Sequence, residues 1–304
     1  MQPIERDVVL EAPPPGPGPA PLVGRTRWGR IRYTVRQSKS FVIGGVIVLA
    51  FVVVALTSRF WVPFEPRALL IGPTLAPPSA DHWFGTNELG SDIFSRTVGA
   101  AVLDLRITFL AVLIAFVIGV GVGTMSGYWA GWLDIVIQRL LEVIQSIPTL
   151  LLAMIVVVAI GPGELNVVIV LAFLGMPYYA RLVRAEVLSK RTWEFAEAAR
   201  MVGGSSWRIA FRHLLPNSLS PALAYASVNA AWVVLVTASL GFLGIGIEPG
   251  TAEWGSMIAR GQAYVVTGQW WISVFPGVAV LLLTTGFYLL GDGLRDVLDP
   301  HSKR

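Results

Sequence analysis

The sequence predicts an all-α polytopic membrane protein with six transmembrane helices. Hydrophobic residues make up 54% of the 304 positions and charged residues only 14%, and the mean hydropathy is +0.66. A chain of this composition has more apolar surface than one soluble core can bury, so a bilayer must act as its solvent. The second observation is a series of long apolar runs, since a helix needs about 20 such residues to cross a membrane.

Six apolar runs are long enough to be the expected transmembrane helices. They cover residues 41–58, 102–124, 135–160, 166–182, 222–247 and 271–290. Gly175 and Pro177 interrupt the short fourth run, but neighbouring groups in a membrane helix can satisfy the carbonyl that a proline leaves free. In the second run Gly119, Gly123 and Gly127 follow a small-xxx-small spacing, which predicts close packing against another helix.

The basic residues determine the expected orientation. With the N-terminus inside, cytoplasmic segments hold 18 of the 23 Lys and Arg residues, and the positive-inside rule then places both termini in the cytoplasm. The same residues explain the pI of about 9.6, so no nucleic-acid partner is predicted. The first apolar run follows a long basic segment without a small-residue cleavage site, so we expect it to be retained as the first helix.

Composition divides the chain into three expected segments. Residues 1–40 are basic and rich in proline, which predicts a disordered cytoplasmic tail, with a ligand for a partner domain as the alternative. Residues 41–101 hold the first transmembrane helix and an external loop. Residues 102–304 form a core of five helices with a polar loop at 193–216.

The polar loop at 193–216 has the pattern of a helical hairpin. Residues 193–202 are mostly helix formers, Gly203 and Gly204 supply the backbone that ends a helix, and Ser205 can cap a second helix. One face of that second helix is expected to hold Trp207, Ala210, Phe211 and Leu214. Periodicity alone leaves two interpretations open: a docking site for another protein, and an amphipathic surface hairpin without a partner.

The sequence lacks residues that several classes of protein need for their function. The absence of cysteine excludes disulfides, thiolate metal sites and a cysteine nucleophile. His82, His213 and His301 all fall in loops or at ends, which argues against an intramembrane serine protease. An ion-gradient-driven transporter normally has ionisable groups near the midplane, and none is evident. Because there is no GxxxxGK[ST] motif, the chain is not expected to bind ATP itself, so any nucleotide hydrolysis would belong to partners, and no catalytic residue or metal site is predicted in this chain.

Other polar residues give candidate sites outside the hairpin. Glu142 lies near the cytoplasmic end of the third run, followed by Gln145 and Ser146. A charge at the bilayer centre costs about 2.5 to 3.5 kcal/mol, so we expect Glu142 to face a subunit interface, a cavity or the cytoplasmic boundary. Our hypothesis for this group is an interface or a gate. Asp92 and Arg96 have helical i,i+4 spacing in the first outer loop. An exposed pair of this kind contributes only about 0.3 to 0.5 kcal/mol, which favours local ordering of the loop over substrate contact.

The outer stretch of residues 248–269 has two interpretations of equal weight. Its Glu253 and Trp254 could line an entrance or receive another protein outside the membrane. Trp254, together with Trp270 and Trp271, also suits the aromatic belt at a membrane interface.

The hairpin carries a family resemblance. Glu197-Ala198-Ala199, followed by Gly203 and then Leu215-Pro216, resembles the EAA loop of the membrane subunits of ABC importers. In that family the loop forms coupling helices that insert into a cleft on the ATP-binding subunit. The resemblance implies that Glu197 contacts this subunit, that the two alanines permit close helix approach, and that Gly203 makes the corner. The coupling residues implied in this way are Glu197, Ala198, Ala199, Arg200, Gly203 and Arg208.

Three further segments narrow the resemblance. Residues 82–96, 240–255 and 291–300 resemble the C-type permease subunit of dipeptide and oligopeptide importers. Over about residues 36–300, this implies a type I permease fold, a bacterial inner-membrane location and peptide import by alternating access. The implied partners are a homologous but non-identical permease subunit, two ATP-binding subunits and an extracytoplasmic substrate-binding protein. Members of this branch also carry nickel chelates or other small solutes, so the cargo stays open at this point.

Overall fold

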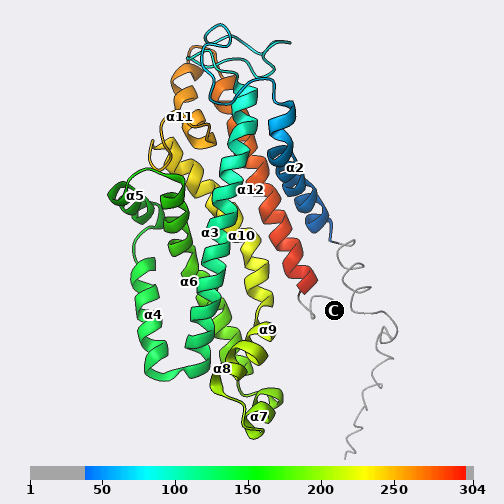
Figure 1. Cartoon of the computed structure of the whole chain (residues 1–304), viewed down its shortest axis with the longest axis vertical. Coiled ribbons are helices and arrows are strands. Elements are labelled where there is room, and N and C mark those ends of the chain that lie inside the picture. The colour runs from blue at the N-terminus through cyan, green and yellow to red at the C-terminus, as the bar shows by residue number, and fades with distance from the viewer. Residues whose placement is uncertain (1–37, 299–304) are drawn as a thin grey trace, which may run out of the picture.

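The computed structural model describes residues 38–298, and this part of the chain is built from helices (Figure 1). Residues 1–37 of the predicted tail lie outside the described part. The helices are α2 (Lys39–Trp61), α3 (Ile93–Trp129), α4 (Gly131–Gln145), α5 (Thr149–Ile160), α6 (Glu164–Lys190), α7 (Glu194–Met201), α8 (Ser206–Arg208), a π-helical turn (Ile209–Leu214), α9 (Leu215–Ser218), α10 (Ser220–Phe242), α11 (Trp254–Val265) and α12 (Trp271–Leu298).

Five described helices, α2, α3, α6, α10 and α12, are each long and apolar enough to cross a membrane, and they cover five of the six predicted runs. The third run differs from the prediction of one continuous helix at 135–160. It is broken into α4 and α5, whose axes are bent by 86°. Pro148 explains the break, because proline lacks a backbone N–H and disfavours helical geometry at the residue before it.

The bundle has two different ends (Figure 1). One end carries α7 to α9, and we call it the hairpin end. The other carries α11 and the loop of residues 62–92 before α3, and we call it the opposite end. Between them α3, α6, α10 and α12 form the middle of the bundle, with α4 and α5 on one flank and α2 on the other.

The central contact of the bundle is the packing of α3 against α6. A Cβ atom on Gly119, Gly123 or Gly127 would lie within 2.8 Å of a backbone oxygen of α6, those of Met176, Ala180 and Arg184 respectively. The three glycines therefore let the two backbones touch, as their spacing predicts. With 37 residues α3 is about 55 Å long, so it extends well beyond the roughly 30 Å hydrocarbon core.

The stretch of residues 248–269, expected as an outer loop, contains the helix α11. This helix packs against α12, α10 and α3. The contact with α10 is close, since a Cβ on Gly255 would overlap the backbone of Ala238. The stretch is therefore an integral part of the bundle.

Candidate functional site

The hairpin of residues 193–216 begins with α7, which is held to the bundle by one buried alanine. Ala196 is fully buried in a cluster with Val183 and Val187 of α6 and with Ile209 of the second arm. Glu197, Ala198 and Arg200 of α7 are exposed. Of the two alanines in the motif, Ala198 is exposed, whereas Ala199 is half-buried and packs against the same cluster as Ala196.

The corner of the hairpin is formed by two glycines with different roles. Gly203 has a φ of +78°, a conformation that favours glycine, and its N–H donates to the carbonyl of Arg200 at 3.0 Å. Gly204 donates to the carbonyl of Ala199 at 3.0 Å, and a Cβ at Gly204 would come within 2.6 Å of that oxygen. The predicted glycine corner is present in the structure.

The second arm departs from the predicted helix. Ser205 does cap it, accepting from the N–H of Arg208 at 3.4 Å. After one α-helical turn the chain widens into the π-helical turn, in which the N–H of Leu215 donates to the carbonyl of Ala210. Pro216 has no N–H to continue an α-helical ladder, so the wider turn lies where a regular helix would lose a bond.

The wider turn changes which side chains are buried. Ile209, Ala210 and Leu214 are buried, whereas Trp207, expected on the buried face, is 58% exposed and stacks on Phe211 with ring centroids 4.9 Å apart. Exposed Trp207, Met201, 88% exposed, and Val202, 85% exposed, all lie within four residues of Gly203 in the sequence. We call these three residues the apolar tip. The sequence analysis missed Met201 and Val202, although their position next to the Gly203 corner is a usable signal.

The base of the hairpin is tied to the long helices. Lys190 at the end of α6 donates to the carbonyl of Asn217 at 2.7 Å and to Glu186 at 2.6 Å. The guanidinium of Arg200 lies over the ring of Tyr128 near the end of α3, 5.9 Å from its centroid. Arg191 also donates to the carbonyl of Tyr128, at 3.4 Å. The hairpin is therefore attached to both α3 and α6.

An ion pair that the sequence analysis did not identify joins three helices at the hairpin end. Arg184 of α6 holds Asp134 of α4 through two hydrogen bonds of 2.5 Å, and Ser126 of α3 donates to the same carboxylate. Asp134 is 9% exposed. The planar guanidinium donates two parallel hydrogen bonds, so this pair fixes the relative position of α4 and α6 and also compensates the charge of the carboxylate. Asp134 precedes the apolar part of α4, so its partner is evident only in three dimensions.

The gate or interface candidates lie beside the break between α4 and α5. Glu142 accepts a hydrogen bond from Arg139 at 2.8 Å, and both side chains are largely exposed. Ser146 donates to the carbonyl of Val143 at 2.8 Å, and Gln145 is half-buried. Within this chain, then, Glu142 lies on an outer face of the bundle.

Asp92 and Arg96 do not form the exposed pair that their spacing suggests. Asp92 is buried and caps α3, accepting from the N–H of Ser95 at 2.7 Å and bonding His82 at 2.9 Å. Arg96 is 4% exposed and donates to the carbonyl of Pro66 at 2.9 Å. Both residues are thus internal to the fold, because the loop of residues 62–92 folds over the beginning of α3. Their contacts agree with the expected local ordering of the loop.

Glu253 and Trp254 are also buried, which corrects the interpretation of Trp254 as an interfacial belt residue. Trp254 is 1% exposed, and its indole N–H donates to the carbonyl of Thr97 in α3 at 2.9 Å. Glu253 caps α11 through the N–H groups of Gly255 and Ser256, both at 2.7 Å. Glu253 nevertheless lines a cavity of about 170 Å³ at the opposite end.

Comparison with known proteins gives concordant matches. Residues 119–304 match the family described as the binding-protein-dependent transport system inner membrane component. The chain is 37% identical to the dipeptide transport system permease protein DppC of Alkalihalophilus pseudofirmus, with 91% of this chain and 90% of that protein covered. It is 35% identical to the glutathione transport system permease protein GsiD of Pectobacterium atrosepticum, with 92% and 93% covered.

A solved structure shares the fold. A chain from the MetNI methionine ABC transporter in an inward-facing conformation superposes with a TM-score of 0.54 at 22% identity. The match covers 67% of this chain and 96% of that one.

Proposed function

The chain belongs to the family of binding-protein-dependent transport system inner membrane components, and we propose that it is the permease subunit of an ABC importer for dipeptides or oligopeptides. The peptide cargo is supported by the names of relatives that cover almost the whole chain, a dipeptide permease and a glutathione permease. In this proposal the chain has no catalytic residues and serves as the membrane path.

The proposed location is the bacterial cytoplasmic membrane, with the hairpin end inside. Eighteen of the 23 Lys and Arg residues then lie in cytoplasmic segments, in accord with the positive-inside rule. Both termini are cytoplasmic in this orientation. The opposite end, with α11 and residues 62–92, faces the extracytoplasmic binding protein.

The observation that carries the proposal is the hairpin, which combines an exposed apolar tip with a firmly attached base. Large apolar side chains exposed at a polar end of a membrane protein mark a surface for another protein. Glu197 and Arg200, both exposed, precede this tip in α7. We infer that an ATP-binding subunit docks here, and that ATP and Mg²⁺ bind that partner.

The proposed mechanism is alternating access. Closure of two ATP-binding subunits moves the hairpin of this chain and that of a homologous second permease. The contacts of Lys190 with Asn217 and of Arg200 with Tyr128 pass this motion to α6 and α3. Because α3 and α6 pack through glycines, the two helices move as one body and reorient the path between the permeases.

The proposal is tested by charge reversal on the exposed face of α7. In the full complex with its binding protein in proteoliposomes, Glu197→Arg is expected to lower uptake of a labelled dipeptide by roughly tenfold, about 1.4 kcal/mol of coupling. ATP hydrolysis is expected to continue. Gly203→Pro should have the same effect, because proline cannot adopt a φ of +78°.

Glu194→Arg is the matched control, since Glu194 lies in the same first turn and has the same effect on the helix dipole. Its uptake is expected to stay near that of the unaltered complex. Normal coupling in both Glu197→Arg and Gly203→Pro would contradict the docking role. Uptake that collapses with an uncoupler and survives ATP depletion would contradict the importer class.

A further inference from the structure

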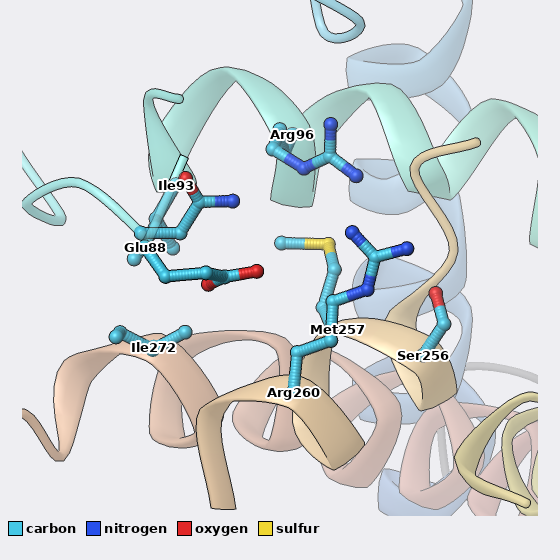
Figure 2. A pocket seen from close by; sticks show the side chains of 8 residues that line it. Glu88, Ile93, Arg96, Ser256, Met257, Arg260 and Ile272 are labelled. Atoms are coloured by element: carbon cyan, nitrogen blue, oxygen red, sulfur yellow. The ribbon is translucent and has the colours of Figure 1, made fainter. Parts of the chain in front are cut away.

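At the opposite end of the bundle, two arginines from different helices face one another across a small pocket. Figure 2 shows the guanidinium groups of Arg96, from α3, and Arg260, from α11, converging on the same space, with the carboxylate of Glu88 pointing into it. Met257 and Ile272 supply apolar walls. The space between these groups has a volume of about 10 Å³, enough for roughly one water molecule.

The two arginines differ in how they are held. Arg96 donates to the carbonyl of Pro66 at 2.9 Å and, at 3.5 Å, to that of Gly250. Arg260 is half-buried and, within residues 38–298, has neither a hydrogen bond nor an ion pair. Its interaction with Arg96 is repulsive. Glu88 compensates only in part, since its buried Oε2 accepts no hydrogen bond.

A larger cavity adjoins this pocket, and Arg260 and Ser256 line both. Its volume is about 170 Å³, and its walls include Phe242, Ile245 and Gly250. Two carboxylates also line it, but they leave Arg260 free. Glu253 is directed to the N–H groups that it caps, and Glu248 is exposed.

This arrangement favours a ligand with an anionic group and an apolar body. A planar guanidinium binds a carboxylate through two parallel hydrogen bonds, and partial burial strengthens that interaction. A second cation behind the first, as Arg96 is here, raises the local positive potential further. The pocket between the arginines is too small for a carboxylate, so the ligand must meet Arg260 from the larger cavity.

We propose that Arg260 binds the C-terminal carboxylate of the peptide cargo as it enters the permease, with Arg96 positioning the cavity wall through Gly250. This inference rests on the proposed function, since it assumes a peptide cargo arriving at the opposite end. The apolar part of the cavity accommodates side-chain atoms next to the carboxylate. Arg260 is thus a residue that distinguishes peptides with a free C-terminus from those without one.

The absence of cysteine allows a direct test in the assembled complex of permeases and ATP-binding subunits. Thr251 lines the cavity, so Thr251→Cys introduces a single thiol there, whose modification is followed on this chain by mass spectrometry. Relative to their rates with a free thiol in solution, the anionic reagent sulfonatoethyl methanethiosulfonate is expected to be favoured over the cationic trimethylammonioethyl analogue. Adding Arg260→Gln should slow the anionic reagent by roughly tenfold, through loss of the local field.

Dialanine and dialanine amide then test the cargo. Dialanine at millimolar concentration is expected to protect the thiol when Arg260 is present and to lose this effect with Arg260→Gln. Dialanine amide, which lacks the carboxylate, should not protect in either case. Arg106→Gln is the matched control, because Arg106 is an exposed arginine of α3 paired with Glu164 at 3.2 Å. Protection by dialanine should persist in that variant.

Equal protection by the two peptides, or an unchanged reaction rate with Arg260→Gln, would overturn the inference. Separate uptake measurements with the binding protein distinguish the two proposals. A complex that imports dialanine without protection of the thiol contradicts only the role of Arg260. A complex that does not import dialanine or longer peptides contradicts the peptide function itself.

Discussion

Glu253 is a carboxylate with no exposed surface, and its environment determines its charge. Burial raises its pKa from the ordinary value of 4.5 to about 7, although the N–H groups of Ser256 and Gly255 favour the ionised form. Asp104 of α3 is buried close by, and its carboxylate accepts from the N–H of Trp254 at 3.4 Å. Arg260 and Glu248 line the same cavity. The protonated form of Glu253 is therefore favoured by folding.

The raised pKa predicts a loss of stability with increasing pH. The contribution of Glu253 is fully present below about pH 4.5 and is lost as the pH rises through about 7, a difference of about 3 kcal/mol. Thermal unfolding in lipid should show that Glu253→Gln flattens the fall in Tm between pH 5 and pH 8. Glu248→Gln, at an exposed carboxylate, is the control and should leave the slope unchanged. Parallel curves for all three proteins would contradict this account.

At the scale of elements, the contact between α3 and α6 depends on glycines at every fourth position. Gly123 has the carbonyl of Ala180 directly against it, whereas a Cβ at Gly121 would meet nothing within 4 Å. The two positions lie on the same helix, two residues apart. Substitutions at these two positions therefore separate the effect of close packing between α3 and α6 from the effect of helix propensity.

Gly123→Ala is expected to destabilise the bundle by about 1 to 3 kcal/mol, because the added methyl forces the two backbones apart. Gly121→Ala should be neutral or stabilising by up to about 1 kcal/mol, since alanine is the better helix former. Thermal unfolding of the purified complex measures both. Equal stability of the two variants would show that α3 and α6 do not rely on this contact.

The break between α4 and α5 is a second feature at this scale. Hydropathy predicts one continuous helix here, because apolar residues predominate on both sides of the break. The direction of the chain changes by 86° at Pro148, and hydropathy carries no information about direction.

At the scale of the whole molecule, the flank formed by α4 and α5 is exposed and largely apolar. Its exposed side chains include Trp132, Ile135, Leu140, Val143, Ile155 and Val158. The ion pair between Arg139 and Glu142 lies on the same flank, and charges are costly against lipid. We therefore expect the Arg139–Glu142 pair to lie against the second permease or in a water-filled gate.

Glu142→Gln tests that location. The exposed pair contributes about 0.3 to 0.5 kcal/mol, so the variant should fold and assemble normally. Dipeptide uptake is expected to fall severalfold because the charge is lost at a moving interface. Glu164→Gln, which removes the partner of Arg106 on α3, is the control. Uptake equal to that of the unaltered complex would exclude a gating role for Glu142.

The sequence by itself determined the class of the protein, five of the six membrane helices and the glycine corner of the hairpin. These features follow from local properties: apolar length, the conformational freedom of Gly203 and the spacing of Gly119, Gly123 and Gly127. These local properties do not depend on how the rest of the chain folds.

Only the tertiary structure decided which polar residues are buried and which meet one another. Asp92, Glu253 and Trp254 lie in segments that read as outer loops, yet each is buried because residues 62–92 and α11 fold onto α3. Arg96 and Arg260 converge for the same reason, through two helices distant in the sequence. Burial and long-range electrostatics are properties of the assembled bundle, so no local pattern can specify them.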